Sequence, residues 1–191
     1  MYQKYFKRLF DIIFSLSLII ILFPIMILVF FLVWFTIGFP IFMQKRPGLD
    51  NKIFILYKFK TLYNSSNFSE KKRQNKVGNF LRKTGLDELP QLFNVLRNNM
   101  SFVGPRPLLL EYLDKYSNYE KKRHIIKPGI TGLAQVNPEP SGIKSWSKSI
   151  KLDSYYDKNV SFILDMQILF KTVKLILYRK KQFKDFKKFY E

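Results

Sequence analysis

The sequence predicts a mainly helical α+β fold, in which an N-terminal re-entrant membrane helix hairpin packs on a small cytosolic domain with short strands and interfacial amphipathic helices. Three observations support this prediction. Residues 12–44 contain no charged side chain over 33 positions, which is typical of a segment in lipid. Residues beyond Lys45 alternate short strand-like stretches with segments of helical periodicity. The formal charge of +19 favours anionic partners such as anionic lipid, phosphorylated substrates or nucleic acid.

The flanks of the apolar segment predict its topology. Lys7 and Arg8 precede it, and Lys45 and Arg46 follow it, so the positive-inside rule places both ends on the cytoplasmic side. A straight helix of this length would reach roughly 50 Å, against a hydrocarbon core of about 30 Å. Pro24 removes one helical hydrogen bond and clashes with the preceding turn. We favour a re-entrant hairpin broken at Pro24, with a single spanning helix as the alternative.

Beyond the membrane segment, the pattern predicts one strand at residues 53–60 and a polar loop at 64–76. A short apolar strand is expected at the centre of the turn-rich stretch 128–140. Residues 101–107 cannot continue a helix through a glycine and two prolines. Hydrophobic periodicity predicts helices over four stretches: residues 77–83, 84–97, 108–124 and 155–178.

Composition excludes several kinds of site. The chain has no cysteine and a single histidine, His124, which removes thiol nucleophiles, disulfides and multi-histidine metal sites. It also lacks the glycine-rich phosphate loops G-x-x-x-x-G-K-[ST] and G-x-G-x-x-G. A bound nucleotide would therefore be held in some other way.

An acidic pair, Asp87 and Glu88, opens the predicted helix after Thr84, which we expect to be its N-cap. At 100° per residue, Asp87, Gln91 and Asn94 share a polar stripe that could face a site. Acids near a helix N-terminus also complement the helix dipole without any further role. Few acids stand among many cations here, and a carboxylate among cations is expected to stay ionised.

The cations that could contact phosphate are lysines and arginines near these acids. Arg106 is notable because Pro105 and Pro107 restrict the backbone on both sides, and a rigid guanidinium suits a diphosphate. The basic residues considered for the site are Lys58, Lys60, Arg82, Lys83, Arg106 and Lys127.

Several motifs, taken in order, closely resemble the small monotopic phosphoglycosyl transferases of the bacterial sugar transferase family. The resemblance covers most of the chain. Its motifs are residues 7–11 (KRLFD), 46–48 (RPG), 57–61 (YKFKT), 86–92 (LDELPQL), 101–107 (SFVGPRP), 128–137 (PGITGLAQVN) and Asp153 with Tyr155 and Tyr156.

The resemblance implies transfer of a sugar 1-phosphate from a UDP-sugar to polyprenyl phosphate with release of UMP, as the first membrane step of glycoconjugate synthesis. Asp87 would be the nucleophile, forming an aspartyl phosphosugar, and would bind Mg²⁺. Glu88 would orient the site or handle a proton. The phosphate-binding candidates are Lys58, Lys60, Arg82 and Arg106, and the substrate-binding candidates are Gln91, Gln135 and Asn137.

We expect three parts in the chain: a re-entrant membrane helix with a basic N-terminal flank (residues 1–44), a catalytic domain on the cytosolic face (45–180) and a basic aromatic tail (181–191). The resemblance implies a location at the cytoplasmic face of the bacterial inner membrane and contact with the lipid bilayer, and a homo-oligomer is left open. Nucleic acid is not expected as a partner, because the positive charge is spread over a membrane-associated chain rather than along one helix. Phe23 stands where the family often has serine, and Pro138-Glu139-Pro140 replaces its usual Gly-Arg-Asn. The alternative function is a non-catalytic basic scaffold, anchored in the membrane, that binds anionic lipid or polymer.

Overall fold

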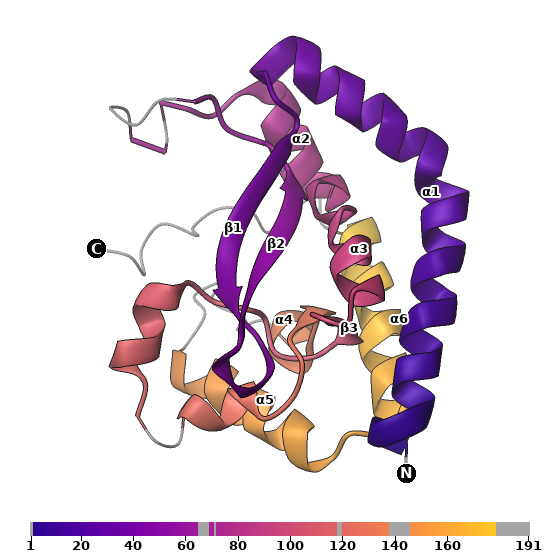
Figure 1. The fold of residues 1–191 in the computed structure, drawn as a ribbon, viewed down its shortest axis with the longest axis vertical. Helices are drawn as coiled ribbons and strands as arrows, with labels where there is room; N and C mark the ends of the chain where they lie inside the picture. The colour runs from indigo at the N-terminus through magenta and orange to yellow at the C-terminus, as the bar shows by residue number, and fades with distance from the viewer. Residues whose placement is uncertain (1, 65–68, 71, 118–119, 138–145, 179–191) are drawn as a thin grey trace.

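The computed structural model describes residues 2–64, 69–70, 72–117, 120–137 and 146–178 (Figure 1). The predicted tail at 181–191 and the Pro138-Glu139-Pro140 loop lie outside these residues. Helical segments dominate and strands are short, so the mainly helical α+β fold is confirmed. The α-helices are α1 (Lys7–Ile37), α2 (Lys76–Thr84), α3 (Gln91–Leu96), α4 (Leu133–Val136), α5 (Trp146–Lys158) and α6 (Phe162–Tyr178).

The strands form two small sheets. β1 (Ile41–Pro47) and β2 (Ile53–Phe59) make an antiparallel hairpin, and β3 (Ser101–Val103) runs parallel to β4 (Gly129–Thr131). β2 confirms the predicted strand. The uncharged run of residues 12–44 is divided between α1 and the start of β1, because the chain turns at Gly38, where φ is 106°.

The long helix α1 lies along one side of the domain (Figure 1). Its 31 residues make it long and apolar enough to cross a membrane, and most of its apolar stretch is not buried by the domain. Met26, Val29 and Val33 form a buried stripe against Phe59 of β2 and Leu81 of α2. Many of the other side chains along the helix are apolar and exposed, as expected of a helix that contacts lipid on one face and protein on the other.

Helical structure continues through Pro24 without interruption. Figure 1 shows α1 changing direction along its length, so it is one bent helix. The predicted break at Pro24 is therefore not confirmed, because the helix bends but remains continuous.

Several predicted helices differ from the observed elements. Thr84 ends α2 instead of capping the next helix, because Gly85 adopts the left-handed conformation (φ 76°) that terminates helices. Residues 108–124 contain two 3₁₀ segments, η4 (Leu110–Lys115) and η5 (Glu120–His124), where a longer α-helix was expected. The predicted helix 155–178 is divided between α5 and α6.

Candidate active site

Asp87 and Glu88 lie in a short 3₁₀ turn, η3 (Leu86–Glu88), between α2 and α3. The turn begins at Gly85, whose carbonyl accepts the Glu88 N–H at 3.1 Å. Asp87 is buried, with 8% of its surface exposed. A compact turn of this kind projects two adjacent carboxylates from a fixed backbone.

Glu88 binds two cations that come from distant parts of the chain. Lys58 Nζ from β2 lies 2.7 Å from Glu88 Oε1, and an Arg106 guanidinium nitrogen lies 3.0 Å from the same oxygen. Lys58 is mostly buried, whereas Arg106 is 42% exposed. We call Lys58, Glu88 and Arg106, together with Asp87, the Glu88 group. The sequence-predicted residues of this group are therefore brought together.

The two acids have opposite pKa shifts. Burial and the Glu88 charge raise the pKa of Asp87 from 3.8 to about 6, although Lys58, Arg106 and Arg82 oppose the rise. Burial would also raise the pKa of Glu88, but the Arg106 and Lys58 cations outweigh it and lower that pKa from 4.5 to about 2. At Asp87 burial affects the pKa more than the neighbouring cations do, yet an acid with a pKa of about 6 is still mostly ionised at pH 7. Glu88 remains ionised throughout the physiological range.

A cavity of about 190 Å³ adjoins the Glu88 group. Its wall combines basic and polar side chains with apolar ones, a composition suited to a ligand with anionic and apolar parts. Its lining residues are Arg46, Leu56, Lys58, Gln91, Arg106, Pro107, Leu108, Leu109 and Tyr112.

Arg82 approaches Asp87 closely enough to lower its pKa. Its guanidinium donates to Thr61 Oγ1 at 2.9 Å and pairs with Glu70 at 2.9 Å. This pair is partly exposed, so a ligand phosphate could compete with Glu70 for the guanidinium.

Three predicted residues have no described contact with the Glu88 group. Lys60 follows β2, and its backbone N–H donates to Pro40 O at 2.8 Å. The Gln135 amide donates to Ile130 O at 3.1 Å, and Asn137 Nδ2 donates to Leu133 O at 2.8 Å. Lys171 Nζ of α6 also donates to Asn137 Oδ1 at 3.4 Å, so the described contacts of Gln135 and Asn137 lie around β4, α4 and α6.

The polar stripe predicted on α3 does not face the site as a whole. Gln91 is buried and lines the cavity. Asn94 is instead fully buried against β2, where its side chain accepts from Tyr57 N at 3.0 Å and donates to Ile55 O at 2.7 Å. The Asn94 amide makes the two backbone hydrogen bonds that a neighbouring strand would otherwise make with β2. Both its donor and its acceptor are thereby satisfied, as a buried amide requires.

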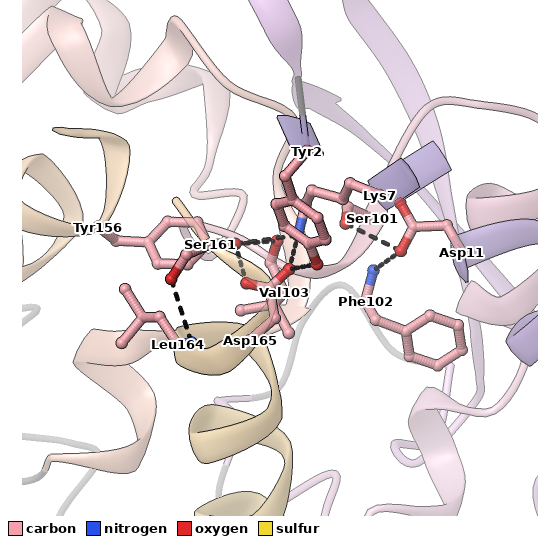
Figure 2. Close-up of polar contacts among 10 residues, drawn as sticks. All are labelled: Tyr2, Lys7, Asp11, Ser101, Phe102, Val103, Tyr156, Ser161, Leu164 and Asp165. Carbon is pink, nitrogen blue, oxygen red and sulfur yellow. Dashed lines mark hydrogen bonds and ion pairs between the residues drawn. The ribbon is translucent and has the colours of Figure 1, made fainter. Parts of the chain in front are cut away.

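A second polar group fixes the start of α1 to the domain (Figure 2). Lys7 Nζ lies 2.5 Å from Asp165 Oδ2, and Tyr156 OH lies 2.5 Å from Asp165 Oδ1. Asp11 accepts from Ser101 Oγ and from the Phe102 N–H, both at 3.1 Å. These contacts give a packing role to the charged residues that precede the apolar segment.

Sequence reasoning gave no role to Arg46, which lines the cavity, or to Arg123. Arg46 stands in the quoted Arg-Pro-Gly motif, which was a usable signal. Arg123 lies in the basic run Lys121–His124 and is buried in the structure. A run of basic residues usually lies at the solvent-exposed surface, so the local sequence did not indicate that Arg123 is buried.

Comparisons with known proteins identify the family of the chain. Residues 2–179 match the bacterial sugar transferase family, so the chain belongs to that family. It is a bacterial phosphoglycosyl transferase. Its long N-terminal apolar helix agrees with a membrane location.

Individual relatives carry more specific names. An uncharacterized sugar transferase, EpsL of Bacillus subtilis, is 43% identical over 177 residues, which cover 90% of this chain and 87% of the relative. A UDP-N-acetylgalactosamine-undecaprenyl-phosphate N-acetylgalactosaminephosphotransferase of Aeromonas hydrophila is 39% identical, over 72% of this chain and 35% of the relative. An undecaprenyl-phosphate galactose phosphotransferase of Salmonella typhimurium is 37% identical, over 92% and 41%. The chain thus spans most of the first relative and less than half of the other two.

Proposed function

We propose that this protein transfers a sugar 1-phosphate from a UDP-sugar to polyprenyl phosphate through a covalent intermediate on Asp87. The observation that carries the proposal is a buried carboxylate, Asp87, beside an acid that holds two cations, Lys58 and Arg106. A scaffold that only bound anionic lipid would not require a buried carboxylate among its cations. The names of several relatives, which specify undecaprenyl-phosphate sugar phosphotransferases, support the same reaction.

In the first step, an Asp87 carboxylate oxygen attacks the sugar-bearing phosphorus of the UDP-sugar. A new O–P bond forms, the bridging P–O bond of the diphosphate breaks, and UMP leaves with the bond's electron pair. With a pKa of about 6, Asp87 is mostly ionised at pH 7 yet more basic than an exposed aspartate. The cationic side chains of Lys58 and Arg106 would offset the charge on the leaving phosphate.

In the second step, a phosphate oxygen of polyprenyl phosphate attacks the aspartyl phosphosugar. The O–P bond to Asp87 breaks, its carboxylate is regenerated, and a polyprenyl diphosphate-linked sugar forms. No net proton transfer is required. Glu88, whose pKa is about 2, is too acidic to carry a proton near neutrality. We propose that Glu88 orients the side chains of Lys58 and Arg106.

Asp87 is also the proposed Mg²⁺ ligand. Among the described residues, no group of three or more His, Cys, Asp or Glu side chains could hold a metal ion. Mg²⁺ is nevertheless commonly bound by one or two carboxylates together with substrate phosphates and water. Because the Glu88 carboxylate is already paired with two cations, Asp87 is the carboxylate of the pair that fits this role. When bound, the ion would neutralise charge on the diphosphate.

The membrane carrier would reach the site along the surfaces that contact lipid. Both halves of α1 pack against the one domain: Ser15 is buried near its start, and Ile37 is buried at its end. A helix anchored to the same domain at both ends is suited to a re-entrant, monotopic placement. α6 adds an exposed apolar face on which Phe170 is 83% exposed, consistent with a helix lying at the interface.

The experiment uses purified full-length protein with labelled UDP-sugars, polyprenyl phosphate and Mg²⁺. We expect UMP release, a lipid-soluble labelled product, and an adduct on Asp87 detectable by mass spectrometry when the carrier is withheld. Asp87→Asn should abolish all three, whereas Asp114→Asn, at an exposed acid in η4, should preserve them. Full turnover by the Asp87→Asn variant would refute the nucleophile assignment.

A further inference from the structure

A buried ion pair outside the Glu88 group contacts the backbone of Arg106. An Arg123 guanidinium nitrogen in η5 lies 2.9 Å from Asp153 Oδ2 in α5, and the two side chains are 5% and 3% exposed. The same nitrogen donates to the Arg106 carbonyl oxygen at 2.9 Å. The ion pair therefore contacts the main chain of a residue whose side chain reaches Glu88.

The Arg106 carbonyl is an effective point at which to hold this loop. Pro105 and Pro107 have no N–H to donate, and the residue before a proline is confined to extended conformations. On the N-terminal side, Gly104 N donates to Thr131 O and Gly129 N donates to Pro105 O, both at 2.9 Å. β4 thus anchors the loop just before Arg106, and Arg123 anchors Arg106 itself.

Asp153 makes this anchoring possible because a buried guanidinium needs a compensating charge. Arg123 also donates to Tyr116 OH at 3.3 Å. One planar guanidinium thus serves a carboxylate, a carbonyl and a phenol at once. A lysine ammonium, with a single nitrogen, is poorly suited to all three.

The geometry points to Asp153 as a positioning residue that acts through Arg123 to hold Arg106 where its guanidinium meets Glu88 and the substrate phosphates. The inference rests on the proposed function for the role of Arg106 toward phosphate. Without the Asp153 charge, Arg123 would turn toward solvent or lose its fixed geometry. The Arg106 backbone would then shift away from the Glu88 group.

The test is a double-mutant cycle in the full-length protein, read by kcat/KM for the UDP-sugar and by the affinity for UMP. Asp153→Asn should lower kcat/KM by about tenfold to 100-fold, raise KM and weaken UMP binding. In an Arg106→Ala background the same change should cost less than about twofold, because the group that Asp153 positions is already absent. Arg123→Lys should behave as Asp153→Asn does in both backgrounds.

Asp165→Asn is the matched control, because it removes the acid of another buried ion pair, with Lys7. Its effects should be equal in the two backgrounds. Thermal unfolding of each variant identifies losses that come from misfolding. Equal losses from Asp153→Asn in both backgrounds, or unchanged UMP affinity in the folded variant, would overturn the inference.

Failure of the proposed function would give a different result. A wild-type protein that binds UMP but transfers no sugar phosphate would count against the proposed reaction, and the UMP affinities of the cycle would still decide the role of Asp153. A wild-type protein that binds no UMP would overturn both proposals.

Discussion

Replacing Asp87 by asparagine should stabilise the protein while it abolishes activity. The folded-state pKa of Asp87 is about 6, against an ordinary value of 3.8. Because the folded pKa is raised, the folded state holds the proton more tightly, and ionisation costs stability as the pH rises through this range. The cost reaches about 3 kcal/mol at pH 7, falls to roughly half of that at pH 5 and is small at pH 4. Asparagine avoids this cost.

The measurement is thermal unfolding of wild type and Asp87→Asn in the same lipid or detergent at pH 7, 5 and 4. A gain of about 3 kcal/mol corresponds to an increase in Tm of about 6–12 °C for a chain of this size, and unmatched hydrogen bonds of the new amide would reduce it. The gain should shrink as the pH falls. Asp114→Asn, at an exposed acid, should give little change. A destabilised Asp87→Asn at pH 7, or a gain independent of pH, would refute the reasoning.

Two further predictions concern the site and the membrane helix. In the protein without Mg²⁺ and substrate, Asp87 should titrate with a midpoint near pH 6, followed by NMR of isotope-labelled aspartate. Glu88→Gln should move this midpoint to lower pH, because the Glu88 charge no longer raises the pKa of Asp87. Glu70→Gln, at the exposed partner of Arg82, should leave the midpoint in place, and an unmoved midpoint in Glu88→Gln would contradict the pKa assignment. Since the chain has no cysteine, a thiol reagent will label only the introduced cysteine in the single variants Gln3→Cys and Lys52→Cys, which change exposed positions. In vesicles of known orientation, both cysteines should react from the cytoplasmic side alone. A label that reaches one of them from outside would indicate a spanning helix.

The elements that the sequence predicted well were those with a strong local pattern. The absence of charge identified most of α1, although the last residues of the uncharged run belong to β1, and the β-branched and aromatic residues of 53–60 identified β2. Helix boundaries near Thr84 and within residues 108–124 were predicted wrongly. At these positions the left-handed conformation of Gly85 and two short 3₁₀ segments set the helix boundaries. Hydrophobic periodicity predicts neither of these features.

The sequence by itself determined the inventory of the site: one acidic pair, a set of cations and an arginine between two prolines. Only the tertiary structure decided which cations meet the acids, because Lys58, Glu88 and Arg106 come from β2, η3 and the loop after β3. It also turned Asn94 toward a strand and buried Arg123 against Asp153. The physical reason is that burial and ion pairing depend on separations in space, and these two effects set the opposite pKa shifts of Asp87 and Glu88.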